Sequence, residues 1–76
     1  MTRVGVVGAS GYTGGELLRL LAMHPKVEVT YATSREYAGK PLTAIHPNFR
    51  GFYEGLKFSQ LSIDMLTNKC DLVFVN

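Results

Sequence analysis

The segment 3–14 reads RVGVVGASGYTG and joins an apolar run to a glycine-rich turn. The run at 3–7 contains three valines, which is typical of a β-strand. Three glycines then stand at intervals of three residues, namely Gly8, Gly11 and Gly14. Glycine is needed where a backbone turns sharply or is approached closely. The segment therefore indicates a strand that ends in a tight and functional turn.

A helical pattern begins inside this turn. The residues spaced as one face of a helix are Gly14, Leu17, Leu18 and Leu21. We predict a helix over residues 12–24 that ends where His24 precedes Pro25, because the residue before a proline disfavours helical geometry. Glu16 is expected in the first helical turn, where the helix dipole favours a negative charge.

The middle of the chain divides into a strand and an irregular segment. Residues 27–33, VEVTYAT, are rich in β-branched side chains and predict a second strand. Residues 34–55 contain three glycines and two prolines without a sustained period. We expect a long irregular connection that could hold one helical turn. Loops longer than about 15 residues are usually functional or disordered.

The last third of the chain predicts two strands and a helix. Residues 56–58 could form a short edge strand, and Ser59 is a suitable N-cap for a helix over 60–68. The apolar side of this helix would carry Leu61, Met65 and Leu66. Residues 71–75 are almost fully apolar, which is expected for a parallel strand buried on both faces.

The alternation of strands and helices predicts an α/β fold, the N-terminal part of a Rossmann-like parallel-sheet dinucleotide-binding domain. A length of 76 residues allows one small domain at most. The most apolar strand is followed only by Asn76, although a central parallel strand normally precedes a covering helix. We therefore expect residues 1–76 to be a partial, truncated domain, with the catalytic domain further along a longer protein.

Composition excludes several classes of protein. Hydrophobic residues make up 46% and charged residues 18%, which is typical of a globular chain. The net charge of +2 is too small to indicate nucleic-acid binding. The apolar runs are too short to span a membrane, and no secretory signal is visible. The single cysteine allows no internal disulfide and suits the cytoplasm.

The strand, the turn and the helix N-terminus together predict a phosphate site. The first N–H groups of a helix lack internal partners, and the helix dipole adds positive charge there. Gly8 would make the turn, Gly11 would admit a pyrophosphate, and Gly14 would let the helix pack closely on the sheet. Ser10 and Thr13 would add hydroxyl donors.

The glycine spacing is one residue longer than the common G-x-G-x-x-G pattern, so the motif alone is not decisive. A P-loop is disfavoured, since no Gly-Lys-Ser/Thr follows. A glycine-rich turn that binds nothing remains the alternative.

The end of the second predicted strand favours NADP over NAD. An NAD site usually has Asp or Glu about 20 residues after the glycines, for the ribose hydroxyls. Arg35 stands near that position, preceded by Thr33 and Ser34. A guanidinium suits a 2′-phosphate. Glu36 could instead orient Arg35 or bind the ribose itself, and Arg35 could be an ordinary solvated arginine.

Several stretches resemble one family of enzymes. GASGYTGGELLRLL, TSREYAGKP, HPNFRG and LKF are similar to the N-acetyl-gamma-glutamyl-phosphate reductase family of arginine biosynthesis. They look most like its archaeal and thermophile branch, which acts on carrier-protein-linked aminoadipyl or glutamyl phosphate in lysine or arginine biosynthesis. The resemblance runs through the whole chain. The glycine motif by itself is shared by the wider semialdehyde dehydrogenase group.

The resemblance implies an NADP-dependent acyl-phosphate reductase, an oxidoreductase that forms a semialdehyde. In that family a cysteine thiolate expels phosphate from the acyl phosphate, NADPH reduces the thioester, and a histidine serves as acid and base. Both catalytic residues lie in a later domain, so we expect the segment alone to be inactive. The full-length protein would be a cytoplasmic homo-oligomer.

The resemblance also implies a set of cofactor-binding residues. Those expected around the pyrophosphate are Ser10, Gly11, Tyr12 and Thr13, and the glycine pattern adds Gly8 and Gly14 to the cofactor-binding turn. Those expected around the adenosine ribose and its 2′-phosphate are Ser34, Arg35 and Glu36. The family loop at 46–51 receives no role from its residues. The rival interpretations are another semialdehyde dehydrogenase, a non-enzymatic nucleotide-binding regulatory module, or a structural piece that binds nothing.

The other reactive side chains are expected to be structural. Cys70 opens an apolar strand and is interpreted as a small buried hydrophobe rather than a nucleophile. His24 would lie at a helix C-terminus, and His46 could contact substrate but is more typical of a structural loop residue. Neither histidine has zinc-ligand spacing with the cysteine. Tyr12 and Tyr53 could stack on a ring, although packing is the default interpretation.

Overall fold

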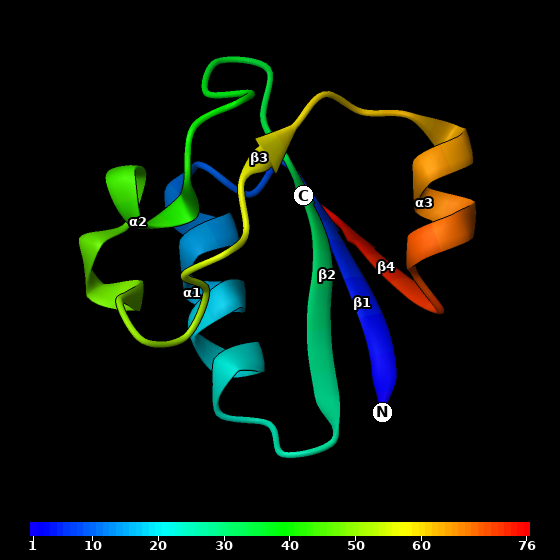
Figure 1. The fold of residues 1–76 in the computed structure, drawn as a ribbon, viewed down its shortest axis with the longest axis horizontal. Helices are drawn as coiled ribbons and strands as arrows, with labels where there is room; N and C mark the ends of the chain where they lie inside the picture. Colours follow the sequence, from blue (N-terminus) through cyan, green and yellow to red (C-terminus); the bar gives the residue numbers. More distant parts are fainter.

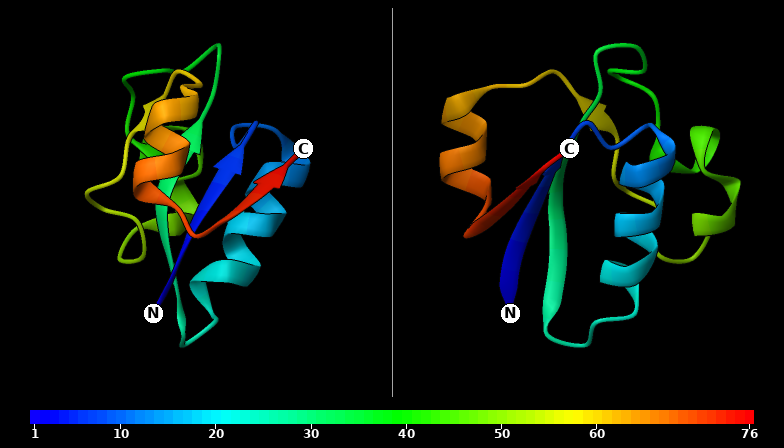
Figure 2. Two further views of the ribbon diagram at one scale, coloured as in Figure 1. Left: turned by 90° about the vertical axis from the view of Figure 1, so that its right-hand side faces the viewer. Right: turned by 180° about the vertical axis from the view of Figure 1, so that it is seen from behind.

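A computed structural model describes residues 1–76 as a four-stranded parallel sheet with helices on both faces. The strand order is β3-β2-β1-β4, and α1 and α3 cover opposite faces (Figures 1 and 2). The elements are β1 (Thr2–Val7), α1 (Tyr12–Ala22), β2 (Val27–Thr33), α2 (Leu42–Ile45), η1 (Pro47–Phe49), β3 (Phe58–Ser59), α3 (Ile63–Lys69) and β4 (Leu72–Val75). The predicted α/β class is confirmed.

β1 lies between β2 and β4, and the glycine turn follows it directly. It pairs in parallel with β2 on one side and with β4 on the other, so that Val4 lies opposite both Val29 and Leu72. All strands therefore end at the same edge of the sheet, where the glycine turn leaves β1 (Figure 1). Parallel α/β sheets bind ligands at this edge.

The hydrophobic core lies between the sheet and α1. Val4 and Val6 of β1 and Leu18 of α1 are fully buried. Phe58 of β3 closes the core at the other end of the sheet and is 1% exposed. Tyr53 donates its hydroxyl to the Leu18 carbonyl at 2.7 Å, and burial raises the pKa of this tyrosine to about 12. The packing role predicted for Tyr53 is confirmed.

The long connection between β2 and β3 is not irregular throughout, because backbone hydrogen bonds join its two ends. Gly39 N–H donates to the Phe58 carbonyl at 2.7 Å, and Phe58 N–H donates to the Lys40 carbonyl at 2.9 Å. The segment between them contains α2 and η1, where a single helical turn was expected. Leu42 and Phe49 anchor it in the core.

Helix α1 is shorter than predicted and ends at Ala22, two residues before His24. The prediction that Glu16 lies in the first turn is wrong, because the helix begins at Tyr12 and its first turn holds no acidic residue. Glu16 lies further along and pairs with Arg19 at 3.0 Å.

The predicted start of the second helix is also wrong. Helix α3 begins at Ile63, and its cap is Ser62, whose hydroxyl accepts the Met65 N–H at 3.4 Å. Ser59 cannot cap it because this residue belongs to β3. Leu61 therefore precedes the helix and is exposed.

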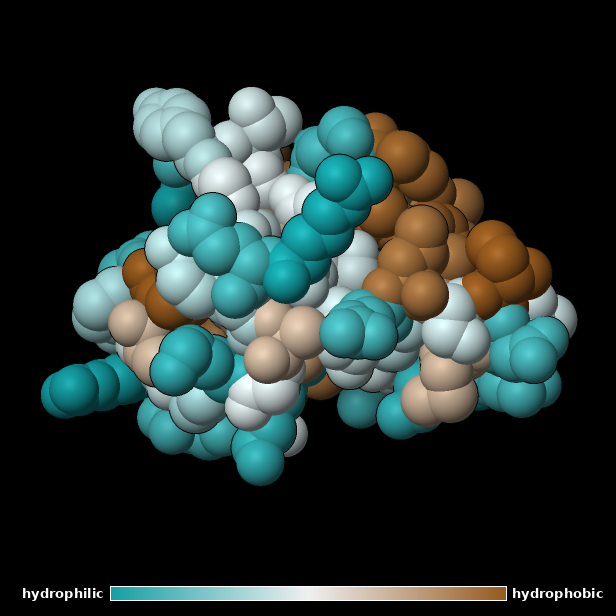
Figure 3. Space-filling model, turned by 90° about the horizontal axis from the view of Figure 1, so that it is seen from above, coloured by the Kyte–Doolittle hydropathy of each residue, from teal (hydrophilic) through white to brown (hydrophobic).

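The strand predicted at 71–75 forms as β4, but the expectation that it is buried on both faces is wrong. Only Val73 is half-buried, because β4 pairs with β1 on one side and no strand lies on the other. Apolar side chains gather on the α3 and β4 side of the molecule (Figure 3). The exposed ones are Leu61, Ile63, Met65, Leu72, Phe74 and Val75.

Candidate functional site

The turn after β1 is held from both sides through its backbone. Gly8 has φ of +78°, a left-handed conformation that favours glycine. Its N–H donates to the Thr33 hydroxyl at 3.1 Å, and its carbonyl accepts the Asn76 side-chain amide at 3.2 Å. Ala9 N–H donates to the Thr33 carbonyl at 2.8 Å. The ends of β2 and β4 therefore fix the turn.

Gly14 is required by close packing. A Cβ atom at Gly14 would lie 2.6 Å from the Gly8 carbonyl oxygen and 2.7 Å from Ala9 Cα. Such contacts are too short for any side chain. The sequence predicted close packing of the helix on the sheet, and the structure shows that the contact is with the turn itself.

Gly11 differs from Gly8 and Gly14, because no contact within the chain requires a glycine at this position. It is the N-cap of α1, with φ of −81°. A Cβ atom built on it would meet nothing within 4 Å. No hydrogen bond of the chain reaches the successive N–H groups from Ser10 to Gly14. The helix start thus offers free donors around an open backbone position.

The end of β2 lies beside the turn. Thr33 and Ser34 are each 4% exposed. The Ser34 hydroxyl donates to the Ser10 hydroxyl at 2.9 Å and accepts the Tyr37 N–H at 3.0 Å. Arg35, the next residue, is exposed. The two sequence segments singled out for the cofactor therefore meet in space.

A hollow of about 490 Å³, here called the Ser34 hollow, lies at this edge of the sheet. It is lined by Val7, Gly8, Ser10, Thr33, Ser34, Arg35, Glu36, Leu61 and Asn76. It brings together Gly8, Ser10, Ser34, Arg35 and Glu36 of the predicted site. Gly11, Thr13 and Gly14 surround the helix start beside it and do not line it.

The predicted site residue Tyr12 does not line the Ser34 hollow. Its side chain is 82% exposed, so its predicted packing role is wrong. It lines a second hollow of about 170 Å³, together with Gly15 and His46.

The carboxylate of Glu36 is directed to its neighbour. A hydrogen bond from Tyr37 to Glu36 raises the pKa of the tyrosine hydroxyl. The chain has two ion pairs, Arg3–Asp71 and Arg19–Glu16, so Glu36 does not orient Arg35. The guanidinium of Arg35 has no partner in the chain.

Two contacts of the turn were missed by sequence reasoning. Asn76 reaches the Gly8 carbonyl, and His46 Nε2 lies 3.1 Å from the Ala9 carbonyl oxygen. A polar residue directly after an apolar strand was a signal for Asn76. Nothing in the aperiodic segment 34–55 indicated that His46 returns to the turn.

Cys70 lies on the α3 face of the sheet. It is partly buried rather than fully buried, and it caps the C-terminus of α3. Its Sγ would lie 2.6 Å from a Cβ atom at Gly5, and it stands 3.8 Å from the Thr30 hydroxyl. Cys70 does not line the Ser34 hollow.

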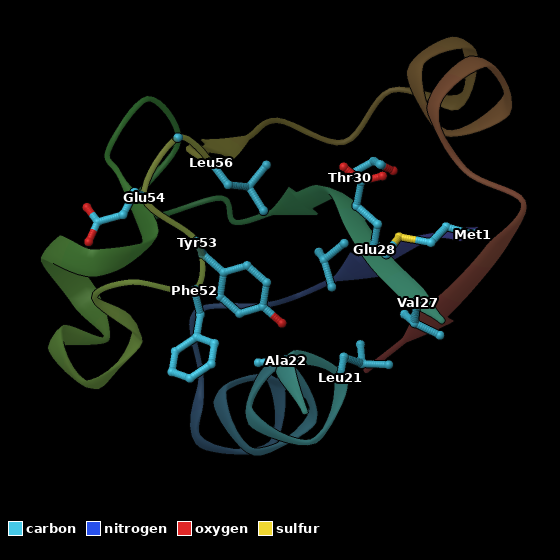
Figure 4. A pocket seen from close by; sticks show the side chains of 12 residues that line it. Met1, Leu21, Ala22, Val27, Glu28, Thr30, Phe52, Tyr53, Glu54 and Leu56 are labelled. Atoms are coloured by element: carbon cyan, nitrogen blue, oxygen red, sulfur yellow. The ribbon is translucent and has the colours of Figure 1, made fainter. Parts of the chain in front are cut away.

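The largest hollow, about 580 Å³, lies at the amino ends of β1 and β2, away from the turn (Figure 4). Leu21, Phe52 and Leu56 give it apolar walls. The Glu54 carboxylate beside it accepts the Gly51 N–H at 2.7 Å.

No group of three or more His, Cys, Asp or Glu side chains is close enough to hold a metal ion. None of the helices combines the length and hydrophobicity needed to cross a membrane.

The parallel sheet, the glycine turn and the helix start define a Rossmann-like nicotinamide dinucleotide-binding unit. The family described as "Semialdehyde dehydrogenase, NAD binding domain" matches residues 3–76. The chain belongs to this family.

Two curated relatives are similar over nearly the whole chain. The LysW-L-2-aminoadipate/LysW-L-glutamate phosphate reductase of Sulfurisphaera tokodaii is 68% identical over 75 residues, covering 99% of this chain and 21% of the relative. The N-acetyl-gamma-glutamyl-phosphate reductase of Methanopyrus kandleri is 59% identical over 75 residues, covering 97% and 22%. The chain thus spans about a fifth of the length of the curated relatives that it matches.

A solved structure shares the fold. The crystal structure of aspartate semialdehyde dehydrogenase with NADP from Candida albicans superposes with a TM-score of 0.84 and 23% identity. The match covers 100% of this chain and 23% of the other.

Proposed function

We propose that residues 1–76 form the NADPH-binding segment of an acyl-phosphate reductase that produces a semialdehyde in amino-acid biosynthesis. The observation that carries the proposal is the open backbone at Gly11. The protein needs glycine at Gly8 for its conformation and at Gly14 for packing, but nothing in the chain occupies the space beside Gly11. A bound pyrophosphate would require that space.

The residues present fit the proposed cofactor. The free N–H groups from Ser10 to Gly14 would donate to the pyrophosphate, with the helix dipole behind them. The buried Ser34 would hold the adenosine side of the site at a fixed distance from Ser10. The unpaired guanidinium of Arg35 would bind the 2′-phosphate, which is the feature that distinguishes NADP from NAD.

The chemistry would be divided between this segment and the rest of the protein. NADPH supplies the hydride when it is bound. The residues of this chain would bind and orient the cofactor. The cysteine nucleophile and the acid–base histidine implied by the family would lie beyond residue 76. The full-length protein is proposed to be a cytoplasmic homo-oligomer.

The proposed substrate is a carrier-protein-linked aminoadipyl or glutamyl phosphate. The support is the 68% identity to a relative named for LysW-linked substrates. N-acetyl-gamma-glutamyl phosphate is the alternative substrate, because the same family resemblance favours it. Turnover of both acyl phosphates by the full-length protein would decide between them.

Two matched variants test the cofactor site in the full-length protein. Gly11 and Gly55 both have open space at the Cβ position and neither has a left-handed backbone. Gly11→Val should abolish NADPH binding in a calorimetric titration, whereas Gly55→Val should bind like the wild type. Equal affinity of the Gly11→Val protein would contradict the proposal, provided that its melting temperature shows it to be folded.

A further inference from the structure

The sequence 46–51 has no assigned role, yet its first residue reaches the glycine turn. His46 follows α2 and is half-buried. Its Nε2 lies 3.1 Å from the Ala9 carbonyl oxygen. A carbonyl only accepts hydrogen bonds, so Nε2 carries the proton and donates it.

The imidazole ring is fixed in place by its neighbours. It lies against Gly15 of α1, where a Cβ atom would be 2.9 Å from Cε1 and 3.3 Å from Nδ1 of the ring. The rings of Phe49 and Phe58 meet it edge-on, with centroids at 5.4 Å and 6.3 Å. Both phenylalanines are buried, so the ring rests on the hydrophobic core.

The contact determines the direction of one peptide group. The carbonyl of Ala9 and the N–H of Ser10 belong to the same planar trans peptide and point in opposite directions. Holding the Ala9 oxygen toward His46 therefore turns the Ser10 N–H away from His46. Ser10 is the first residue in the run of N–H groups that have no partner in the chain.

We propose that His46 is a positioning residue for the dinucleotide turn, which orients the Ala9–Ser10 peptide before the cofactor arrives. The inference rests on the proposed function, because it assigns His46 to the same site. It also explains the long connection between β2 and β3, since α2 and η1 carry the histidine back from the core to the turn. His46 itself touches no phosphate in this proposal.

Two amide variants separate the donor from the bulk of the side chain. Glutamine carries an N–H at the distance of Nε2, whereas asparagine carries one only at the distance of Nδ1. In the full-length protein, His46→Asn should raise the dissociation constant for NADPH by about three- to tenfold, the effect of one hydrogen bond. For His46→Gln, the dissociation constant for NADPH should lie within about twofold of the wild-type value.

A second pair of variants tests the position of the ring. Gly15→Ala should stabilise α1, since alanine is the better helix former, and yet weaken NADPH binding, because the new Cβ displaces the imidazole. In a His46→Ala background, Gly15→Ala should not change the affinity. An effect on stability alone would move both quantities in the same direction.

The outcomes distinguish the two proposals. If the wild type binds neither NADPH nor NADH, the proposed function is wrong and the role of His46 falls with it. If the wild type binds NADPH but His46→Gln is as weak as His46→Asn in folded protein, only the role of His46 is wrong. An effect of Gly15→Ala that persists without the imidazole would also overturn it.

Discussion

The hydroxyl of Ser34 donates to the hydroxyl of Ser10 across 2.9 Å and joins the end of β2 to the glycine turn. The same Ser34 oxygen accepts the Tyr37 N–H at 3.0 Å. One buried hydroxyl group thereby connects the two halves of the proposed site. Its removal affects both halves at once.

Ser34→Ala is expected to lower the free energy of unfolding by about 1 kcal/mol, because the Tyr37 N–H loses its partner. Urea denaturation of the full-length protein measures the change. Ser59→Ala is the control, since the Ser59 hydroxyl makes no hydrogen bond and should cost less than about 0.5 kcal/mol. Equal losses in the two variants would show that the Ser34 contacts contribute nothing.

Arg35→Ala is expected to weaken NADPH by about tenfold or more and to leave NADH almost unchanged, because only NADPH carries the 2′-phosphate. Arg50 is also exposed and does not line the Ser34 hollow, so Arg50→Ala serves as the matched control. Titration of each cofactor by fluorescence gives the four affinities. A similar loss for both cofactors in Arg35→Ala would remove the assignment of the 2′-phosphate.

Gly5→Ala is expected to destabilise the fold by about 1 to 3 kcal/mol through overpacking. The added Cβ would stand 2.6 Å from Cys70 Sγ and 3.4 Å from Leu66 Cδ2. Cys70→Ala in the same chain removes the sulfur and should recover most of the loss. Melting temperatures of the two single variants and the double variant give the coupling, and strictly additive effects would refute the contact.

The stability of the fold should depend on Tyr53 at alkaline pH. Burial raises the pKa of Tyr53 to about 12, above the value of about 10 in an unfolded chain. The folded state holds the proton more tightly, so this contribution is complete below pH 10 and is lost as the pH rises toward 12. Relative to Tyr53→Phe, the wild type should lose roughly 1 to 2 kcal/mol over this range. Parallel stability curves for the two proteins would contradict the prediction.

The local parts of the fold were predictable, because strand, turn and helix each leave a pattern in consecutive residues. β2 has the predicted bounds, and the left-handed conformation of Gly8 follows from the tight turn. The start of α3 was not predictable, since Ser59 and Ser62 are equally good caps and only the pairing of β3 decides between them.

The assembly of the site from distant residues was predictable only in part. The number of residues between the glycines and the end of the second strand predicted that Ser34 and Arg35 lie at the site, because a parallel crossover returns the second strand beside the first. The approach of His46 depends on how the core packs around Phe49 and Phe58, and such packing leaves no period in the sequence.

The central position of β1 also sets an order in which the turn can be completed as the chain is synthesised. The contacts of Gly8 with Thr33 and of Ser10 with Ser34 span 25 and 24 residues, so they can form first. The contact of Ala9 with His46 spans 37 residues, and that of Gly8 with Asn76 spans 68. Residues leave the ribosome in sequence order, and closing a longer loop costs more entropy. The nascent chain can therefore build β1, α1 and β2 as a nucleus before His46 and then Asn76 become available. The turn would thus acquire its hydrogen bonds in the order of synthesis, with Asn76, directly after β4, adding the last one.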